Sequence, residues 1–182
     1  MKRAYSLFYH IGKLINREQH VTNKNNKYRH MNYKTYKQPR LTALFGETTQ
    51  RYSYSNIVMH PIPFTPTLKK IKQQIETITN HSFNTALINL YRNGNDSNGW
   101  HADNEKELGK NPIIASLSLG EVRPFHFKHR TLNSQRHKLA LEHGSLLIMK
   151  GEMQHHWLHQ IAKTKKQIRP RINLTFRQLI DR

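Results

Sequence analysis

RPRINLTFRQL, residues 169–179, is the stretch of this chain that decides its fold. Polar and apolar residues alternate along it, and successive side chains of a β-strand point to opposite faces. The stretch therefore predicts a strand with one polar and one apolar face. The polar face carries Arg171, Asn173, Thr175 and Arg177, and the apolar face carries Ile172, Leu174 and Phe176.

Two guanidinium groups on one face of this strand indicate an anionic partner. Arginine binds carboxylates through two parallel hydrogen bonds. Arg171 and Arg177 together therefore fit a dicarboxylate, of which 2-oxoglutarate is an example. The alternative is an outward-facing edge strand whose charges prevent pairing with other chains.

A second polar pair lies earlier in the chain, in ALINLYRNG, residues 86–94. Asn89 and Tyr91 share one strand face, opposite Ile88 and Leu90. An amide and a phenol hydroxyl at these positions could complete the contacts to a carboxylate. Taken alone, this segment is an ordinary strand.

WHADNE, residues 100–105, is the candidate metal-binding segment. His101 and Asp103 are two positions apart, so an extended backbone projects both side chains from the same face. Two histidines and one carboxylate on one face, with open positions opposite, bind iron(II) in non-haem oxygenases. The pair alone is weak evidence, because the chain contains 13 histidines.

The second histidine has three candidates in QHHWLHQ, residues 154–160. A strand would place His155 and His159 on one face and His156 on the other. Spacing does not select among the three, and they could also be ordinary residues of a surface loop.

The rest of the chain predicts one long helix followed by short strands. Residues 66–80 repeat apolar residues at a spacing of three and four, which is typical of an amphipathic helix. The strand-like segments are 86–91, 113–119, 124–128, 138–141, 145–150 and 171–178. A helix followed by such strands favours an α+β fold with a β-sandwich or barrel core.

Composition bounds the site and its partners. The 182 residues suit one domain, and the absence of cysteine excludes disulfides, zinc–cysteine sites and thiol nucleophiles. A net charge of +19 favours a polyanionic partner, nucleic acid first. The sequence has no long apolar segment, so a membrane anchor is not expected.

The N-terminal sequence is basic and weakly patterned. Residues 1–38 form a segment that we expect to be only partly ordered, with five Lys or Arg from Asn23 to Lys37. The apolar run at the start is short and lacks a small-residue cleavage site, so no secretion signal is expected. The expected compartment is the cytoplasm of a bacterium or the nucleus of a eukaryote, with a mitochondrial presequence left open.

Taken together, these segments resemble the AlkB family of nucleic-acid dealkylases, and most of all the branch that contains the human DNA-repair homologues. The resemblance runs from about Pro39 to Arg177. It implies a double-stranded β-helix, or jelly roll, with flanking helices over residues 39–182, including a nucleotide-recognition lid. Its pieces come in family order: PRLTALFG, YSYS, FNTALINLYRNG, HADNE, PIIASLSLG, HGSLLIM, HHWLH and RINLTFR.

The resemblance also implies a role for each candidate site residue. Iron(II) would be held by His101, Asp103 and His159, the last histidine of the HW-x-H stretch. 2-Oxoglutarate would be surrounded by Asn89, Tyr91, Arg171, Asn173 and Arg177, with Thr175 on the same face.

Substrate contacts are implied at three further places. Tyr52 and Tyr54 match aromatic positions of the lid, where rings stack on an extruded base. Asn104 and Glu105 follow the iron ligands and would approach that base. Phe45-Gly46 matches a loop that wedges into the base stack in relatives acting on duplexes, whereas the alternative for Phe45 is a core position.

The implied reaction is oxidative dealkylation of bases such as 1-methyladenine and 3-methylcytosine in DNA, or in RNA. It would use iron(II), dioxygen and 2-oxoglutarate, and release formaldehyde, succinate and carbon dioxide. We expect the chain to act as a monomer. Two alternatives remain: a dioxygenase of this class with a substrate other than nucleic acid, and a non-catalytic nucleic-acid binder with the same fold.

Overall fold

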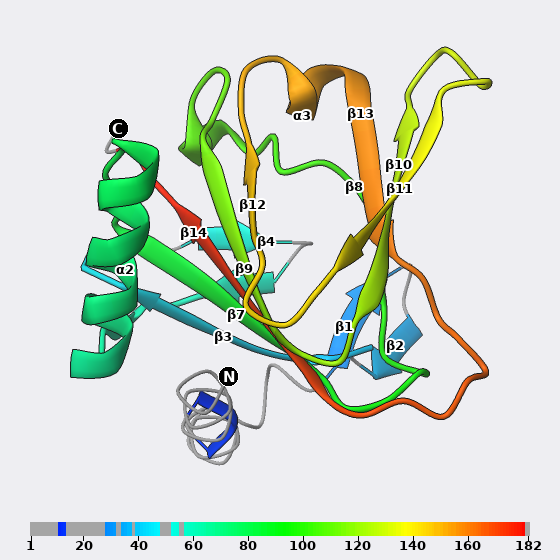
Figure 1. Cartoon of the computed structure of the whole chain (residues 1–182), viewed down its shortest axis with the longest axis horizontal. Helices are drawn as coiled ribbons and strands as arrows, with labels where there is room; N and C mark the ends of the chain where they lie inside the picture. Colours follow the sequence, from blue (N-terminus) through cyan, green and yellow to red (C-terminus); the bar gives the residue numbers. More distant parts are fainter. Residues whose placement is uncertain are drawn as a thin grey trace.

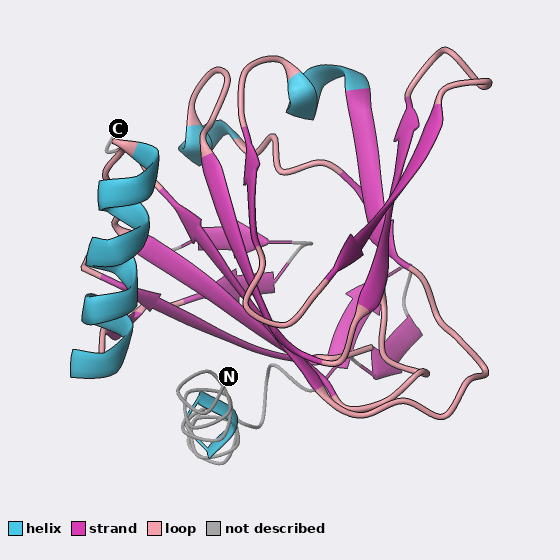
Figure 2. Ribbon diagram, viewed as in Figure 1, coloured by secondary structure: helices cyan, strands magenta, loops and turns pink. Residues whose placement is uncertain are grey.

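Two β-sheets lie face to face, and the helix α2 (Pro66–Thr79) packs on the outer side of the larger sheet (Figure 1). The computed structural model describes residues 11–13, 28–31, 34–37, 39–47, 52–54 and 57–180, and within 28–37 and 52–58 it describes only the backbone. Strands dominate this part of the chain (Figure 2). The predicted α+β fold with a jelly-roll core is confirmed.

The larger sheet has six strands and holds the strand from which the sequence argument began. Its neighbours are antiparallel except for the last pair, which is parallel. In order across the sheet, the strands are β12 (Leu146–Met149), β9 (Ile114–Gly120), β14 (Arg171–Arg177), β7 (Thr85–Tyr91), β3 (Leu41–Gly46) and β6 (Ile62–Pro63).

The smaller sheet has four strands, all antiparallel to their neighbours. In order, they are β11 (Arg136–Leu141), β10 (Arg123–His129), β13 (Trp157–Ile161) and β8 (Asn98–His101). A short helix, α3 (Met153–His156), leads into β13, and the 3₁₀ turn η1 (Lys106–Leu108) follows β8. Two small hairpins complete the described elements: β1 (Tyr28–Met31) with β2 (Lys34–Lys37), and β4 (Tyr52–Tyr54) with β5 (Ile57–Met59).

β14 occupies the middle of the larger sheet, between β9 and β7, so the edge-strand alternative is wrong. Its apolar side chains Ile172, Leu174 and Phe176 are completely buried in one cluster with Leu68 and Ile75 of α2. The apolar face therefore packs under the helix. The polar face must point the other way, into the space between the two sheets.

The predicted helix is confirmed, with one residue off its buried face. Thr65 begins α2 as N-cap, with Oγ1 accepting a hydrogen bond from Leu68 N at 3.3 Å, and Pro66 occupies the first turn, where its missing N–H costs nothing. Asn80 ends the helix at φ 48°, in the left-handed region. Ile78 lies in the last turn and is 70% exposed, so it does not join the core face.

Three residues near the start of the chain, 11–13, are described by the structure and contact the core. Ile11 is completely buried in the main core cluster, and a Cβ on Gly12 would lie 3.7 Å from Ile172 Cδ1. Part of residues 1–38 therefore packs on the outer side of the larger sheet. No helix in the described part of the chain has the length and apolarity needed to cross a membrane.

Phe45 is a core residue, and the prediction that it wedges into a base stack is wrong. It lies in β3 opposite Ala86 and Ile62, and none of its surface is exposed. Gly46 ends the same strand, where a Cβ would lie 3.0 Å from Pro61 Cβ and 3.2 Å from the Asn84 carbonyl oxygen. The apolar run LTALF forms a buried strand of the sheet, so the Phe45 ring is not available to DNA.

We expect Phe45→Ala to lower the free energy of unfolding by about 3–5 kcal/mol, because it leaves a cavity in a close-packed core. Ile78→Ala, an apolar truncation on an exposed position, should change it by less than about 0.5 kcal/mol. Urea denaturation followed by circular dichroism measures both. A Phe45→Ala protein as stable as Ile78→Ala would contradict the core assignment.

Candidate metal and co-substrate site

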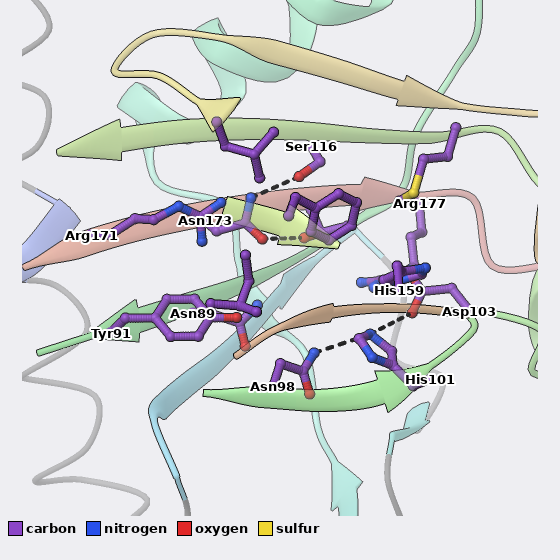
Figure 3. Close-up of a pocket in the computed structure, with 15 residues that line it drawn as sticks. Asn89, Tyr91, Asn98, His101, Asp103, Ser116, His159, Arg171, Asn173 and Arg177 are labelled. Atoms are coloured by element: carbon purple, nitrogen blue, oxygen red, sulfur yellow. Dashed lines mark hydrogen bonds and ion pairs between the residues drawn. The ribbon is translucent and has the colours of Figure 1, made fainter. Parts of the chain in front are cut away.

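One cavity between the two sheets is lined by all nine residues predicted to hold iron and 2-oxoglutarate (Figure 3). Its empty space, including the open mouth, amounts to about 420 Å³. The larger sheet contributes the polar faces of β7 and β14, and the smaller sheet contributes β8 and β13. The predicted residues are Asn89, Tyr91, His101, Asp103, His159, Arg171, Asn173, Thr175 and Arg177.

His101, Asp103 and His159 meet on the smaller sheet. His101 ends β8 and is paired directly with His159 on β13, so their ring centroids lie 4.2 Å apart. Asp103 follows in the loop after β8. Each of the three offers one ligand atom, and these atoms all lie within 4.8 Å of one another. Among the described residues this is the group of His, Asp and Glu side chains that could hold a metal ion.

The hydrogen bonds of His101 fix which ring nitrogen faces the site. Nδ1 lies 2.7 Å from the Gly99 carbonyl oxygen, which only accepts, so Nδ1 carries the proton. Burial lowers the pKa of His101, which favours the neutral ring. Nε2 is therefore an acceptor, facing Asn98 Nδ2 at 3.0 Å and Asp103 Oδ1 at 3.7 Å. A histidine that donates its other N–H to a carbonyl is the usual orientation of a metal ligand.

Asp103 is an ionised carboxylate in which one oxygen accepts a hydrogen bond and the other can bind a metal ion. Burial favours its neutral form, but the Arg177 guanidinium outweighs this and holds the pKa well below its usual range. Arg177 Nη2 donates to Oδ2 at 2.7 Å, and Oδ1 is buried with no hydrogen-bond partner in the part of the chain that the structure describes. Two electron-rich atoms, Asp103 Oδ1 and His101 Nε2, thus face each other, and a cation between them would remove their repulsion.

His159, and neither His155 nor His156, points into the cavity. Burial lowers the pKa of His159 to about 3, so the ring is neutral, as metal binding requires. The two other histidines belong to α3 and are exposed: Nε2 of His155 contacts Asn111 Oδ1 at 2.7 Å, and Nε2 of His156 lies 3.4 Å from Glu152 Oε2. The segment is a helical turn before a strand, so the strand-face argument applies only from residue 157 onward.

The other end of the cavity is a site for an anion. Arg171 is 1% exposed, and its Nη2 donates to Ser118 Oγ at 2.9 Å. Its Nε and Nη1 are buried without a hydrogen-bond partner among the described residues. Burial lowers the pKa of Arg171 to about 10, so the guanidinium remains charged at neutral pH. A buried cation with two open donors fits a carboxylate.

Side-chain hydrogen bonds hold the middle of the cavity wall in place. Asn173 Nδ2 donates to Ser116 Oγ at 2.8 Å, and Thr175 Oγ1 donates to Asn173 Oδ1 at 3.0 Å. On β7, Asn89 Oδ1 accepts from Arg40 Nε at 2.8 Å. Asn173 and Asn89 are thus oriented before any ligand binds.

The residues predicted to contact the substrate are not gathered at this cavity. Asn104 is exposed and Glu105 is half-buried, and neither lines the cavity. Tyr52 and Tyr54 belong to β4, and their side chains lie outside the described residues. The roles of these four residues stay predictions.

Sequence reasoning missed two buried residues that support the site. Gln154 is completely buried on α3, and its Oε1 accepts a hydrogen bond from Asp103 N at 2.9 Å. Arg123 is 1% exposed, and its Nη2 donates to the carbonyl oxygens of Asp96 and Ala162, at 3.1 and 2.6 Å. The guanidinium carbons of Arg123 and Arg171 lie 5.7 and 5.3 Å from the centroid of the Tyr91 ring. No pattern in the sequence marks Gln154. Ser116 and Ser118, which accept hydrogen bonds from Asn173 and Arg171, were also missed. They could have been found, because they alternate with apolar residues as the polar residues of β14 do.

Comparison with known proteins agrees with this geometry. Residues 7–177 match the family model described as the 2OG-Fe(II) oxygenase superfamily. The chain belongs to the 2OG-Fe(II) oxygenase superfamily. The oxygenase fold is also found in a solved structure titled "The structure of OsALKBH1", with a TM-score of 0.62 over 91% of both chains at 20% identity.

Curated relatives of this chain carry AlkB names, which confirms the resemblance seen in the motifs. The human alpha-ketoglutarate-dependent dioxygenase alkB homolog 3 is 47% identical over 79% of this chain and 52% of its own length. The Bos taurus protein of the same name is 49% identical over the same shares. The human DNA oxidative demethylase ALKBH2 is 37% identical over 78% of this chain and 57% of its own length. The chain thus spans about half the length of these relatives.

We expect Gln154→Leu to weaken Mn(II) binding by about 10- to 100-fold, because the main chain at Asp103 loses the acceptor that orients it. Gln154→Glu keeps an oxygen at that position and should recover most of the affinity. Isothermal titration of each purified variant measures the constants, and circular dichroism verifies the fold. Wild-type affinity in a folded Gln154→Leu protein would show that this hydrogen bond does not position the metal ligand.

Proposed function

We propose that this chain removes alkyl groups oxidatively from base nitrogens of nucleic acid, using iron(II), dioxygen and 2-oxoglutarate. The observation that carries the proposal is the pairing of two open sites in one cavity. Asp103 Oδ1 and His159 Nδ1 lack hydrogen-bond partners at one end, and Arg171 lacks them at the other, within the described residues. A metal ion and a carboxylate would satisfy both ends.

His101, Asp103 and His159 would hold the iron, and their protonation states suit it. The neutral rings and the ionised carboxylate require no further loss of protons before binding. Three protein ligands leave open positions for a chelating co-substrate and dioxygen. Bound iron(II) would supply the activation of dioxygen coupled to decarboxylation of 2-oxoglutarate.

The two arginines of β14 would have different roles. Arg171 would bind the carboxylate of 2-oxoglutarate remote from the metal, because its open donors lie at the end of the cavity with Tyr91 and Ser118. Arg177 would orient Asp103 through their 2.7 Å hydrogen bond and add positive charge beside the metal ligands. Asn89, Asn173 and Thr175 would complete the polar wall between them.

A nucleic-acid substrate is supported by charge and by the relatives. The net charge of +19 attracts phosphate groups without regard to sequence. Human ALKBH2 is named a DNA oxidative demethylase. An alkylated base such as 1-methyladenine or 3-methylcytosine pairs poorly, so extruding it from a duplex costs less than extruding a normal base.

We assign residues 39–182 to the catalytic domain and the basic residues 1–38 to an added segment, part of which packs against it through Ile11. The residues that would hold iron and 2-oxoglutarate all belong to this chain, so the proposed reaction requires no residue from a second subunit. The compartment that we propose is one that holds DNA: the cytoplasm of a bacterium or the nucleus of a eukaryote, with a mitochondrial presequence left open.

The proposal predicts formaldehyde release from oligonucleotides that contain 1-methyladenine, only when iron(II) and 2-oxoglutarate are both present. Matched single- and double-stranded DNA and RNA should be assayed in parallel. Asp103→Ala should reduce the release at least 100-fold, because it removes a metal ligand and the carboxylate that Arg177 Nη2 bonds. Turnover of 2-oxoglutarate with a protein or lipid substrate, but none with nucleic acid, would contradict the proposal.

A pair of arginine variants separates the co-substrate site from general charge. Arg171→Met should raise the KM for 2-oxoglutarate by roughly 30-fold or more, because it removes a buried charge partner of the carboxylate. Arg169→Met removes an exposed arginine two positions away and should leave that KM unchanged. Equal KM values for both variants would contradict the role of Arg171.

A further inference from the structure

The smaller sheet carries no acidic residue. Its four strands read NGWH, RPFHFKH, RHKLAL and WLHQI. Residues 122–141, which include β10, β11 and their connection, hold five Lys or Arg and no Asp or Glu. The strands of this sheet therefore carry positive charge that no acidic residue on the same strands balances.

Three of the four Lys or Arg on these strands, Lys128, Arg136 and Lys138, lie on the face that points away from the cavity, whereas Arg123 is buried on the inner side. His101 and His159 point inward, so neighbouring positions along each strand point outward. Lys128 on β10 lies directly opposite Arg136 on β11, and both side chains are positively charged. Like charges placed directly opposite each other across strands destabilise a sheet. An anionic partner on this face would offset that repulsion.

Protection of a sheet edge explains only part of this pattern. β11 is an edge strand, and lysine or arginine on such a strand blocks pairing with other chains. Lys128, however, lies on the interior strand β10, and no edge needs it there. Its Nζ lies 4.7 Å from the centroid of the Trp100 ring on β8, across the face, so the ammonium group is held in place over an aromatic ring.

Trp100 adds an aromatic surface to this basic face. Its side chain is large and mostly apolar, and yet the residue is 37% exposed. Exposed aromatic rings beside a row of cations are the combination by which sheet surfaces bind single-stranded nucleic acid, with bases stacked on rings and phosphates beside the cations. A lipid surface would need a larger apolar area than one ring.

We propose that this outer basic face, formed by Trp100, Lys128, Arg136 and Lys138, binds the sugar–phosphate backbone of nucleotides that flank the target base. The inference rests on the proposed function for the choice of partner, and it adds a second contact on the opposite side of the sheet from the cavity. The face increases affinity for long strands. A trinucleotide that fills only the cavity gains nothing from it.

Two charge-matched double variants test whether nucleic acid binds at this outer basic face. Arg136→Gln with Lys138→Gln removes two exposed cations from β11, and Lys69→Gln with Lys70→Gln removes two exposed cations from α2. The helix and the β10–β11 hairpin lie at opposite sides of the molecule (Figure 1). Both variants lower the net charge equally, so a difference between them reports the face and not the overall charge.

The measurement is the dissociation constant of an unmethylated single-stranded 15-nucleotide DNA, by fluorescence anisotropy across a salt series. We expect the β11 variant to bind on the order of tenfold more weakly and its salt slope to fall by about 1.4, since each single-strand phosphate contact contributes about 0.7. The α2 variant should keep both values. Trp100→Ala should also weaken binding, and Trp100→Phe should restore it.

Equal weakening by both double variants, or by neither, would overturn the proposal. Loss of binding to phosphatidylserine vesicles with unchanged DNA binding would identify a lipid partner and also overturn it. Formaldehyde release from a 1-methyladenine trinucleotide separates the two claims: the β11 variant should retain it. If no protein releases formaldehyde but the variants still differ in DNA binding, the proposed function fails and the basic face stands.

Discussion

The buried ion pair between Arg177 and Asp103 is the interaction on which the site depends. Both side chains are at most 3% exposed, and their 2.7 Å hydrogen bond joins the larger sheet to the loop after β8. Removing one partner of such a pair costs about 3–5 kcal/mol, because the other charge stays buried alone. The pair keeps Asp103 ionised and fixes which of its oxygens remains open. The pair thus links β14 of the larger sheet to the loop that carries a metal ligand of the smaller one.

The two faces of β14 explain how one short strand serves both fold and chemistry. Its apolar face completes the core under α2, and its polar face lines the cavity. Arg171 and Arg177 are tolerated in the middle of the sheet because each has an anionic or polar neighbour: Ser118 for Arg171 and Asp103 for Arg177. The donors of Arg171 that remain open favour an anionic ligand over a purely structural role.

Alternation along single strands could be predicted from the sequence, whereas contacts between distant segments could not. The polar face of β14 and the pair His101 and Asp103 are visible as residues two positions apart. The choice of His159 needed the resemblance, because the turn of α3 before β13 breaks the two-residue pattern. Gln154 meets Asp103 across 51 positions, a contact that only the assembled sheets produce. For Phe45 the resemblance implies a wedging loop and the preceding apolar run favours a core strand, and pairing with β7 decides for the strand.

The account is tested most directly by titrating Mn(II) into the wild-type chain and two histidine variants, with electron paramagnetic resonance reporting the bound ion. The central claim is that His159, with His101 and Asp103, holds one metal ion in the cavity. The wild type and His155→Ala should each bind one ion with equal affinity. His159→Ala should bind it more than about 100-fold more weakly, a larger loss than that expected for an outer partner of a ligand. Wild-type affinity in His159→Ala, or a loss in His155→Ala, would contradict the account.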